Sequence, residues 1–313
     1  MNEFSPVLVT GGAGFLGAFV LDALRESGGE TVLLDRPSVG EGDEVLHADL
    51  EEGPPDLGGF QPRTVMHLAG LAHVVLRGEA ARRRFYEVNV GGTKNLLLGL
   101  EQAGELPEAL VFVSTVAVYG VEEGEALDED APRNAVDPYG QSKRQAEDLL
   151  VEWGERMGVR IGIVRLPLVA GRGAPGNLGA MVSALLRGRY LGIGRGDTRR
   201  SMVLAADVAR TLPKVAEMGG VFHLTDGHHP SFVELEDSLC RALGRTPPRR
   251  LPVVAARMLA AAGDAAGTVG LGAPFSSHTL KKMTSTLTFS DERARRELGW
   301  RPSRVVDAAE TLV

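Results

Sequence analysis

The sequence of 313 residues contains a single cysteine, Cys240. One cysteine excludes a disulfide within the chain and a zinc site built from several cysteines, and it is typical of a reducing compartment. We interpret Cys240 as a small buried hydrophobic residue. The seven histidines form no helical pair with an acidic third ligand, so we expect no metal site.

Long apolar runs and an excess of positive charge are also missing. The first ten residues lack the regions of a signal peptide, and the apolar segment 253–263 is too short to span a bilayer. With 34 basic residues against 41 acidic ones, the net charge is −7. This charge argues against nucleic acid or an anionic membrane as a partner. We therefore expect a cytoplasmic protein with no nucleic-acid and no membrane partner.

The chain does have enough apolar material for a sizeable core, at 43% hydrophobic residues. Up to residue 170, short apolar strand patterns alternate with helical patterns. This alternation predicts an α/β fold, a doubly wound parallel sheet of the Rossmann type. It also predicts a dinucleotide-binding domain over residues 1–170. The alternation then weakens, which predicts a smaller C-terminal substrate-binding lobe over 171–313, with residues 201–226 returning to the main sheet.

A glycine-rich segment follows the first strand pattern and precedes a helical one. Gly11 permits a tight turn, Gly14 lets the backbone approach a phosphate, and Gly17 lets the helix pack closely on the strand. The unpaired amides at a helix start attract anions. We predict that this segment binds a pyrophosphate; the alternative is a glycine-rich turn without a ligand.

Carboxylates and small residues end the next strand patterns. Asp35 stands where a carboxylate accepts the ribose hydroxyls of adenosine and repels a 2′-phosphate. This favours NAD over NADP as the cofactor, although Arg36 beside it favours the opposite. Asp49 is either a contact of the adenine amino group or a loop cap. Ala69 and Gly70 are small enough to let the backbone approach a cofactor.

Groups capable of proton transfer lie at the end of the fifth strand pattern and in the helical pattern after it. Ser114 and Thr115 end that strand, at the edge where parallel sheets bind ligands. After it, Asp137 is expected to cap a helix that carries Tyr139 and Lys143 on one face. A cation one turn away lowers the pKa of a phenol from about 10. The pattern therefore predicts a tyrosine that exchanges protons with a ligand.

Polar residues elsewhere allow more than one interpretation. The arginines at 82–84 open a helical pattern that reaches residue 103, and we interpret them as a solvated face. Within that helix Asn89 either lies at the cofactor or bonds a neighbouring carbonyl. Asn177 and Arg200 are candidates for holding a substrate diphosphate, or else capping and surface residues.

The motifs TGGAGFLG, HLAG, NVGGTKN, STVAVYG, PYGQSK and TFSDERARRELGW resemble those of the extended short-chain dehydrogenase/reductase family, in particular its UDP-sugar 4-epimerases and related nucleotide-sugar epimerases and dehydratases. The resemblance covers nearly the whole chain. It implies Tyr139 as the acid/base, Lys143 as the group holding the nicotinamide ribose, and Thr115 as the catalytic hydroxyl. The NAD site that it implies consists of Gly11, Gly14, Phe15, Leu16, Gly17, Asp35, Arg36, Asp49, Leu50, Leu68, Ala69, Gly70, Asn89, Ser114, Tyr139 and Lys143.

The same resemblance implies a substrate and a reaction. A nucleotide sugar, expected to be a UDP-hexose, is implied to bind to Thr115, Asn177, Arg200 and Lys281. The implied reaction is inversion at C4 through a 4-keto sugar, in a homodimer formed through the helices at 82–103 and 139–157. Two alternatives remain: a one-way 4-dehydrogenase or keto-reductase of a polysaccharide pathway, and a non-catalytic dinucleotide sensor of the same fold.

Overall fold

The computed structural model describes residues 4–36, 45–72, 78–268 and 275–313. Within these residues, seven parallel strands form the central sheet: β1 (Val7–Thr10), β2 (Thr31–Asp35), β3 (Val45–His47), β4 (Thr64–His67), β5 (Ala109–Thr115), β7 (Arg160–Leu166) and β11 (Gly220–His223). Their spatial order is β11-β7-β5-β4-β1-β2-β3. The order reverses beside β1, as in a doubly wound sheet. The predicted fold class is confirmed.

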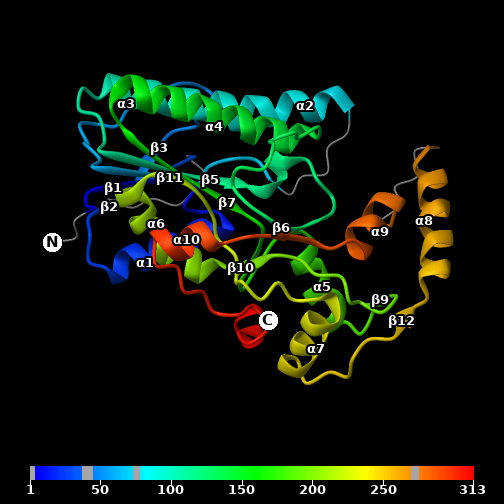
Figure 1. Ribbon diagram of the computed structural model, residues 1–313. Coiled ribbons are helices and arrows are strands. Elements are labelled where there is room, and N and C mark those ends of the chain that lie inside the picture. The colour runs from blue at the N-terminus through cyan, green and yellow to red at the C-terminus, as the bar shows by residue number, and fades with distance from the viewer. Residues whose placement is uncertain (1–3, 37–44, 73–77, 269–274) are drawn as a thin grey trace.

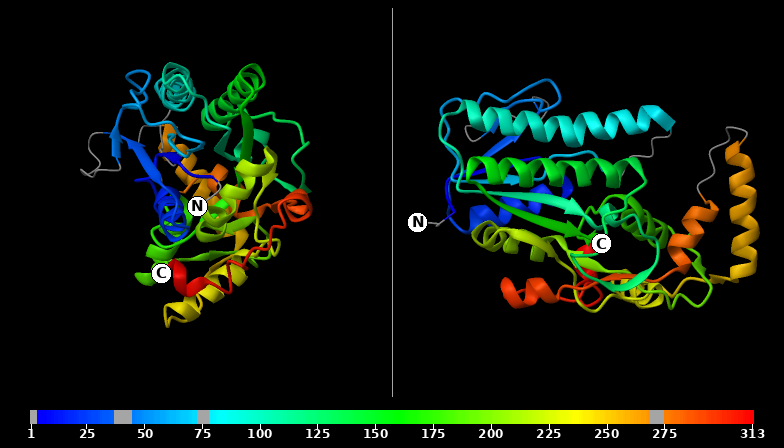
Figure 2. Two further views of the ribbon diagram at one scale, coloured as in Figure 1. Left: turned by 90° about the vertical axis from the view of Figure 1, so that its left-hand side faces the viewer. Right: turned by 45° about the horizontal axis from the view of Figure 1, so that its top comes forward.

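Helices cover both faces of this sheet (Figures 1 and 2). One face carries α1 (Phe15–Glu26) and α6 (Ala205–Met218). The other carries α3 (Gly92–Gln102) and α4 (Pro138–Met157), with α2 (Gly78–Tyr86) beside them. A π-helical segment, Glu87–Gly91, joins α2 to α3 without a loop. The predicted helix over 82–103 therefore exists, but with a local change of winding.

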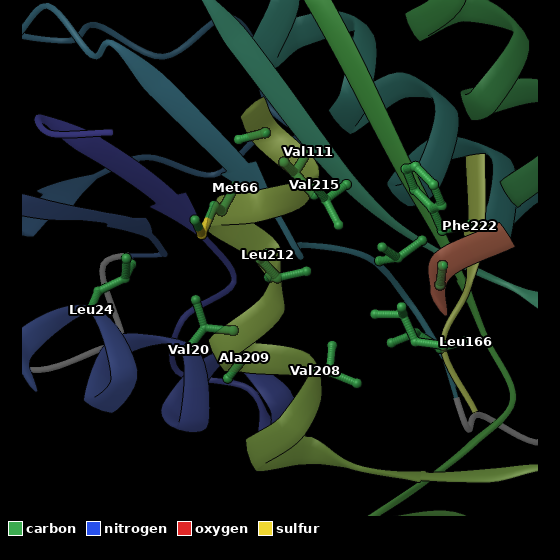
Figure 3. Packing of buried hydrophobic residues seen from close by; sticks show 14 of the residues in the cluster. Val20, Leu24, Met66, Val111, Leu166, Val208, Ala209, Leu212, Val215 and Phe222 are labelled. Atoms are coloured by element: carbon green, nitrogen blue, oxygen red, sulfur yellow. The ribbon is translucent and has the colours of Figure 1, made fainter. Parts of the chain in front are cut away.

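The main core lies between the sheet and the helices α1 and α6 (Figure 3). Strand residues on both faces are buried, because a parallel sheet with two helical layers has no solvent-facing side. This explains why the strand patterns read as continuous apolar runs. Fully buried members of this cluster include Val9, Val20, Met66, Val111 and Leu212.

Shorter elements extend the carboxyl side of the sheet. Three further strand pairs, all parallel, occur in the described part: β8 with β10, β9 with β12, and β6 with β13. The bounds are η2 (Val116–Tyr119), β6 (Gly124–Leu127), β8 (Leu168–Ala170), α5 (Gly176–Leu186), β9 (Gly192–Ile193), β10 (Met202–Leu204), α7 (Phe232–Ala242), β12 (Arg250–Leu251), α8 (Val253–Thr268), α9 (Ser277–Thr284), β13 (Leu287–Phe289), α10 (Glu292–Glu297) and η3 (Ala309–Leu312).

The C-terminal part of the chain contributes to both regions. From the segment 201–226, β11 joins the edge of the main sheet beside β7, whereas β10 pairs with β8 outside it. Later in the chain, Ala294 and Trp300 lie in the cluster that packs on the main sheet. The division of function at residue 170 stays a prediction.

A substitution in this core tests the packing. Leu212→Ala removes a fully buried side chain of α6 and leaves a cavity, so the free energy of unfolding should fall by about 2–5 kcal/mol. Urea denaturation measures the change. Leu186→Ala is the matched control, because this leucine is 46% exposed; its effect should stay within about 0.5 kcal/mol. Equal losses for the two variants would contradict this account of the core.

Candidate active site

The glycine-rich segment after β1 has the geometry that the sequence predicts. Gly11 adopts φ = +71°, and a Cβ on it would lie 2.6 Å from the Ala69 nitrogen. A Cβ on Gly17 would lie 2.3 Å from the Gly11 carbonyl oxygen. Gly14 precedes α1, and no side chain of the described residues caps this helix start. The first amides of α1 are thus open to an anion.

A cleft of about 330 Å³ opens beside this segment, at the carboxyl ends of β1 to β4. In a doubly wound sheet, ligands bind at this edge, where the strand order reverses. Nine of the predicted cofactor residues line the cleft: Gly11, Gly14, Asp35, Arg36, Asp49, Leu50, Leu68, Ala69 and Gly70. The predicted residues Phe15, Leu16 and Gly17 form the first turn of α1 next to it.

The two predicted carboxylates both lie in the cleft wall. Asp35 accepts hydrogen bonds from the backbone nitrogens of Ala13, at 3.2 Å, and of Arg36, at 2.8 Å. It therefore fixes the glycine-rich loop. Asp49 accepts a hydrogen bond of 2.9 Å from the Glu51 nitrogen, which is the loop cap that the sequence left as one alternative.

Arg84 is among the cleft residues that the sequence analysis did not place there. Arg84 lines the cleft and forms an ion pair with Glu51, although the arginines at 82–84 were expected to form a solvated face. Arg84, Val88 and Gly92 all line the cleft at intervals of four residues. This helical spacing is the signal that would have placed Arg84 on the inner side.

The helix α4 begins as predicted. Asp137 accepts a hydrogen bond of 2.9 Å from the Gly140 nitrogen, and Pro138 occupies the first turn. This start fixes Tyr139 against Phe85 of α2, with 5.8 Å between the ring centroids. A hydrogen bond joins Tyr139 to the hydroxyl of Thr115 at the end of β5.

The expected lowering of the tyrosine pKa by Lys143 is wrong for this structure. Burial raises the pKa of Tyr139 to about 12, and the hydrogen bond with Thr115 opposes this only in part. Lys143 instead donates a hydrogen bond of 2.9 Å to the Val113 carbonyl and lies 4.3 Å from the centroid of Phe112. Burial lowers the pKa of Lys143 to about 8.

Asn89 lies in the π-helical segment and joins α4 to the end of β4. Its Oδ1 accepts a hydrogen bond of 2.7 Å from the Leu71 nitrogen, and its Nδ2 donates to the Leu71 carbonyl and to Ser142. A Cβ on Gly70 would lie 3.0 Å from Asn89 Oδ1 and 3.2 Å from Lys143 Nζ. Asn89 thus bonds a neighbouring carbonyl, and it also borders the site.

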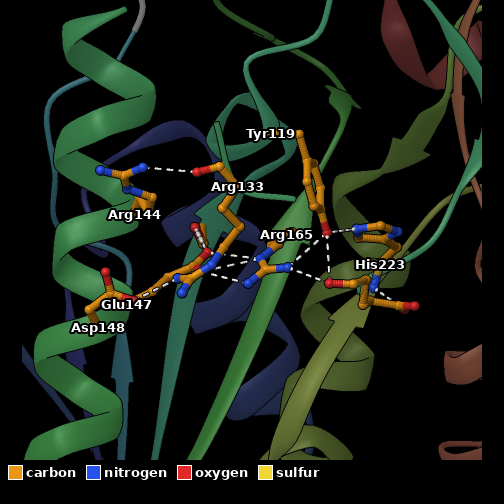
Figure 4. Close-up of polar contacts among 9 residues, drawn as sticks. Tyr119, Arg133, Arg144, Glu147, Asp148, Arg165 and His223 are labelled. Atoms are coloured by element: carbon orange, nitrogen blue, oxygen red, sulfur yellow. Dashed lines mark hydrogen bonds and ion pairs between the residues drawn. The ribbon is translucent and has the colours of Figure 1, made fainter. Parts of the chain in front are cut away.

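A buried polar network, shown in Figure 4, holds the strand ends behind this site. Its centre is the ion pair between Glu147 of α4 and Arg165 of β7, with a shortest distance of 2.8 Å. Ser114 donates a hydrogen bond to Glu147, so its hydroxyl is turned into the network rather than the cleft. Arg165 also donates to Tyr119, whose hydroxyl lies 2.6 Å from His223 Nε2. Sequence analysis identified Ser114 but not these partners.

The predicted substrate residues are only partly brought together. Arg200 donates a hydrogen bond to the Lys282 carbonyl, and Lys281 forms an ion pair of 2.6 Å with Glu122. Glu122 also raises the pKa of Arg200, so the two cations share one acidic neighbour, although burial has the larger effect and lowers the pKa of Arg200. Asn177 lies exposed in the first turn of α5, and its side chain has no hydrogen-bond partner among the described residues.

The comparisons with known proteins agree with this geometry. The model of the NAD dependent epimerase/dehydratase family matches residues 7–223. The chain belongs to this family. A UDP-glucose 4-epimerase of Azospirillum brasilense is 36% identical over 184 residues, which cover 55% of this chain and 51% of the relative. The chain spans about half the length of the curated relatives it matches.

Solved structures of similar proteins match almost the whole chain. The UDP-glucose 4-epimerase of Thermus thermophilus, in complex with NAD, has a TM-score of 0.73 at 24% identity and covers 98% of this chain and 97% of its own. MoeE5 in complex with UDP-glucose and NAD has a TM-score of 0.74 at 25% identity, with coverages of 98% and 96%.

The cleft of this family member fits a dinucleotide. An uncapped helix start faces it, the Gly11 turn leaves no room for a side chain, and Asp35 supplies a carboxylate in its wall. These are the groups that hold a pyrophosphate and a ribose. Among the described residues, no cluster of three or more His, Cys, Asp or Glu is arranged to hold a metal.

His67 supports the floor of this cleft. Its Nδ1 lies 2.7 Å from the Thr10 hydroxyl and its Nε2 3.0 Å from the Thr93 hydroxyl. Burial, with a smaller effect of Lys143, lowers the pKa of His67 to about 3. The imidazole is therefore neutral and structural at neutral pH.

This lowered pKa predicts a pH dependence of stability. Between pH 6.5 and 3 the unfolded chain binds a proton at this histidine and the folded chain does not. The free energy of unfolding should therefore fall as the pH drops below 6.5. In His67→Gln this part of the fall should be absent, as urea denaturation at about pH 7 and about pH 5 would show. Identical pH dependence in the variant and the parent would contradict the assignment.

Proposed function

We propose that this protein catalyses the NAD-dependent epimerisation of a nucleotide sugar, a UDP-hexose, at C4. The observation that carries the proposal is the hydrogen-bonded pair of Thr115 and Tyr139, next to Lys143 and to a cleft suited to a dinucleotide. The UDP-glucose 4-epimerase of A. brasilense and the complex of MoeE5 with UDP-glucose and NAD support the substrate and the cofactor.

In this proposal the chain holds the cofactor along the carboxyl edge of the sheet. The amides that begin α1 bind the pyrophosphate, and Asp35 accepts the ribose hydroxyls. A negative charge at that position repels a 2′-phosphate, which favours NAD over NADP. Lys143 contacts the nicotinamide ribose at the far end of the cleft. Bound NAD supplies a reversible hydride acceptor.

Tyr139 moves the proton. It takes the proton of the sugar C4 hydroxyl as the C–H hydride leaves, and it returns a proton to the 4-keto oxygen when the hydride comes back on the other face. Its raised pKa suits the return step, because a protonated phenol can donate. The hydrogen bond with Thr115 lowers the pKa and so assists the first step.

The residues after Thr115 limit what else can happen to a 4-keto sugar. Dehydration needs an acid to protonate the leaving hydroxyl and a base to remove the C5 proton. Val116 and Ala117, which begin η2, provide neither group. Re-reduction of the 4-keto sugar, or its release, is therefore the expected outcome.

The proposal includes a diphosphate contact, a homodimer and a cytoplasmic location. Arg200 and Lys281 suit the diphosphate because both carry a positive charge near β6, and Asn177 would have to approach from α5. For the dimer we propose contact through the helices at 82–103 and 139–157, which comprise the end of α2, the π-helical segment, α3 and α4 and lie together on one face of the sheet (Figure 1). The single cysteine supports a reducing compartment.

The reaction itself is tested by incubating the purified protein with UDP-glucose and NAD. We expect UDP-galactose, seen by NMR as a changed C4 configuration with no change in mass. Loss of water from the substrate would overturn the interpretation of Val116 and Ala117. Release of oxidised sugar with one NADH per turnover would identify a dehydrogenase instead, and NAD binding without any turnover would identify a sensor.

The role of the phenol is tested by Tyr139→Phe, which removes the hydroxyl and keeps the ring. Turnover should fall by about a hundredfold or more, because general acid/base catalysis typically contributes this much, while NAD affinity measured by calorimetry should change little. Tyr190→Phe is the control, since it removes another hydroxyl, one that donates to Glu236. Activity of Tyr139→Phe within a few-fold of the parent would assign the proton transfer to another group.

A further inference from the structure

The charge of this protein is divided unevenly along the chain. Residues 1–170 contain 14 Lys and Arg against 28 Asp and Glu, a net charge of −14, whereas residues 171–313 contain 20 against 13, a net charge of +7. The net charge of −7 for the whole chain hides this division. A charge asymmetry of this kind orients a protein in an electric field, with its basic part toward an anionic surface.

The helix α8 lies at the far edge of the basic part (Figures 1 and 2). Its inner side packs through Ala256 and Ala260 against Ile193 and Leu280. Its outer side presents large apolar residues to solvent: Val254 is 68% exposed, Met258 71% and Leu259 56%. These are three of the four most exposed large hydrophobic side chains of the described residues.

A further exposed apolar residue lies in the loop near the start of α8. Leu191 is 53% exposed and precedes β9, and the backbone nitrogen of Gly194 after this strand donates to the carbonyl of Leu251, just before α8. This hydrogen bond holds the loop beside the start of the helix.

Basic residues accompany the apolar ones. Arg257 is exposed on α8 itself, Arg249 precedes β12, and Arg195 is 90% exposed. Arg195 forms an ion pair of 3.5 Å with Asp197, and Asp264 lies in the second half of α8. We call Leu191, Val254, Met258 and Leu259 with these three arginines the α8 surface.

An apolar helix face flanked by arginines is typical of helices that lie in the headgroup region of a bilayer. Within the described residues no helix is long and apolar enough to cross a membrane. The α8 surface is therefore suited to lie on a membrane. We propose that it docks on the surface of an anionic lipid bilayer. This differs from the expectation drawn from the net charge, and it does not depend on the proposed reaction.

A second copy of the chain is a less suitable partner for the α8 surface. Two copies that met through it would bring the arginines of the two α8 surfaces together. The apolar residues also occupy a broad face: Val254 and Met258 are one helical turn apart, whereas Leu259 is turned by about 100° from Met258. Paired helices usually present a narrower apolar seam. Anionic lipid matches both the charge and the width of the surface.

Cosedimentation of the full chain with vesicles tests the proposal. We compare vesicles of phosphatidylcholine with vesicles that contain equal parts of phosphatidylcholine and phosphatidylglycerol, at low salt and at about 0.5 M NaCl. The protein should sediment with the anionic vesicles only, and more weakly at high salt because the attraction of the arginines is screened.

A matched pair of variants locates the contact. Met258→Glu should weaken vesicle binding at least tenfold, whereas Met218→Glu, at a methionine 46% exposed at the end of α6, should bind as the parent does. Thermal unfolding checks that both variants fold. Equal binding of Met258→Glu and the parent, or no binding to anionic vesicles, would overturn the proposal. Light scattering measures the molar mass of the parent and of Met258→Glu in solution. If the parent is an oligomer and the variant is smaller, the α8 surface binds a second copy of the chain, and the proposal is wrong.

Discussion

The buried ion pair of Glu147 and Arg165 is the interaction on which the arrangement of the site depends. Glu147 is almost fully buried, and such a carboxylate is stable only with a cation and further hydrogen bonds around it. Arg165 and Ser114 supply these from β7 and β5. Because Lys143 lies one turn before Glu147, the same contacts fix the part of α4 that faces the cleft. The position of Tyr139 relative to Thr115 follows from this attachment.

The parts of the fold that could be predicted from the sequence are those that depend on local patterns. The strand runs, the glycine-rich turn and the cap at Asp137 are short-range signals, because each depends on residues a few positions apart. Contacts between distant segments were not predictable in this way. Glu147 and Arg165 are 18 residues apart, Tyr119 and His223 are 104 apart, and only the folded chain brings each pair together.

The pKa values at the site could not be predicted from the sequence either. The spacing of Tyr139 and Lys143 places them on one helix face, but it does not fix where the ammonium points. In the structure the Val113 carbonyl and the Phe112 ring hold the ammonium, and burial dominates the pKa of both residues. The net charge also failed to predict the basic α8 surface. It is a sum over the chain and carries no information about where the charges lie.

The π-helical segment Glu87–Gly91 has a consequence for how insertions and deletions are tolerated here. A π-turn contains about one residue more than an α-turn, and it arises readily from a one-residue insertion in an α-helix. Because the wider turn absorbs that residue, α2 and α3 keep nearly the angular phase of one continuous α-helix. Loss of one residue from the π-turn itself would therefore leave Arg84 in the cleft wall and α3 on the sheet. A one-residue deletion within the regular winding of α2, after Arg84, would instead rotate Arg84 by about 100° away from the cleft.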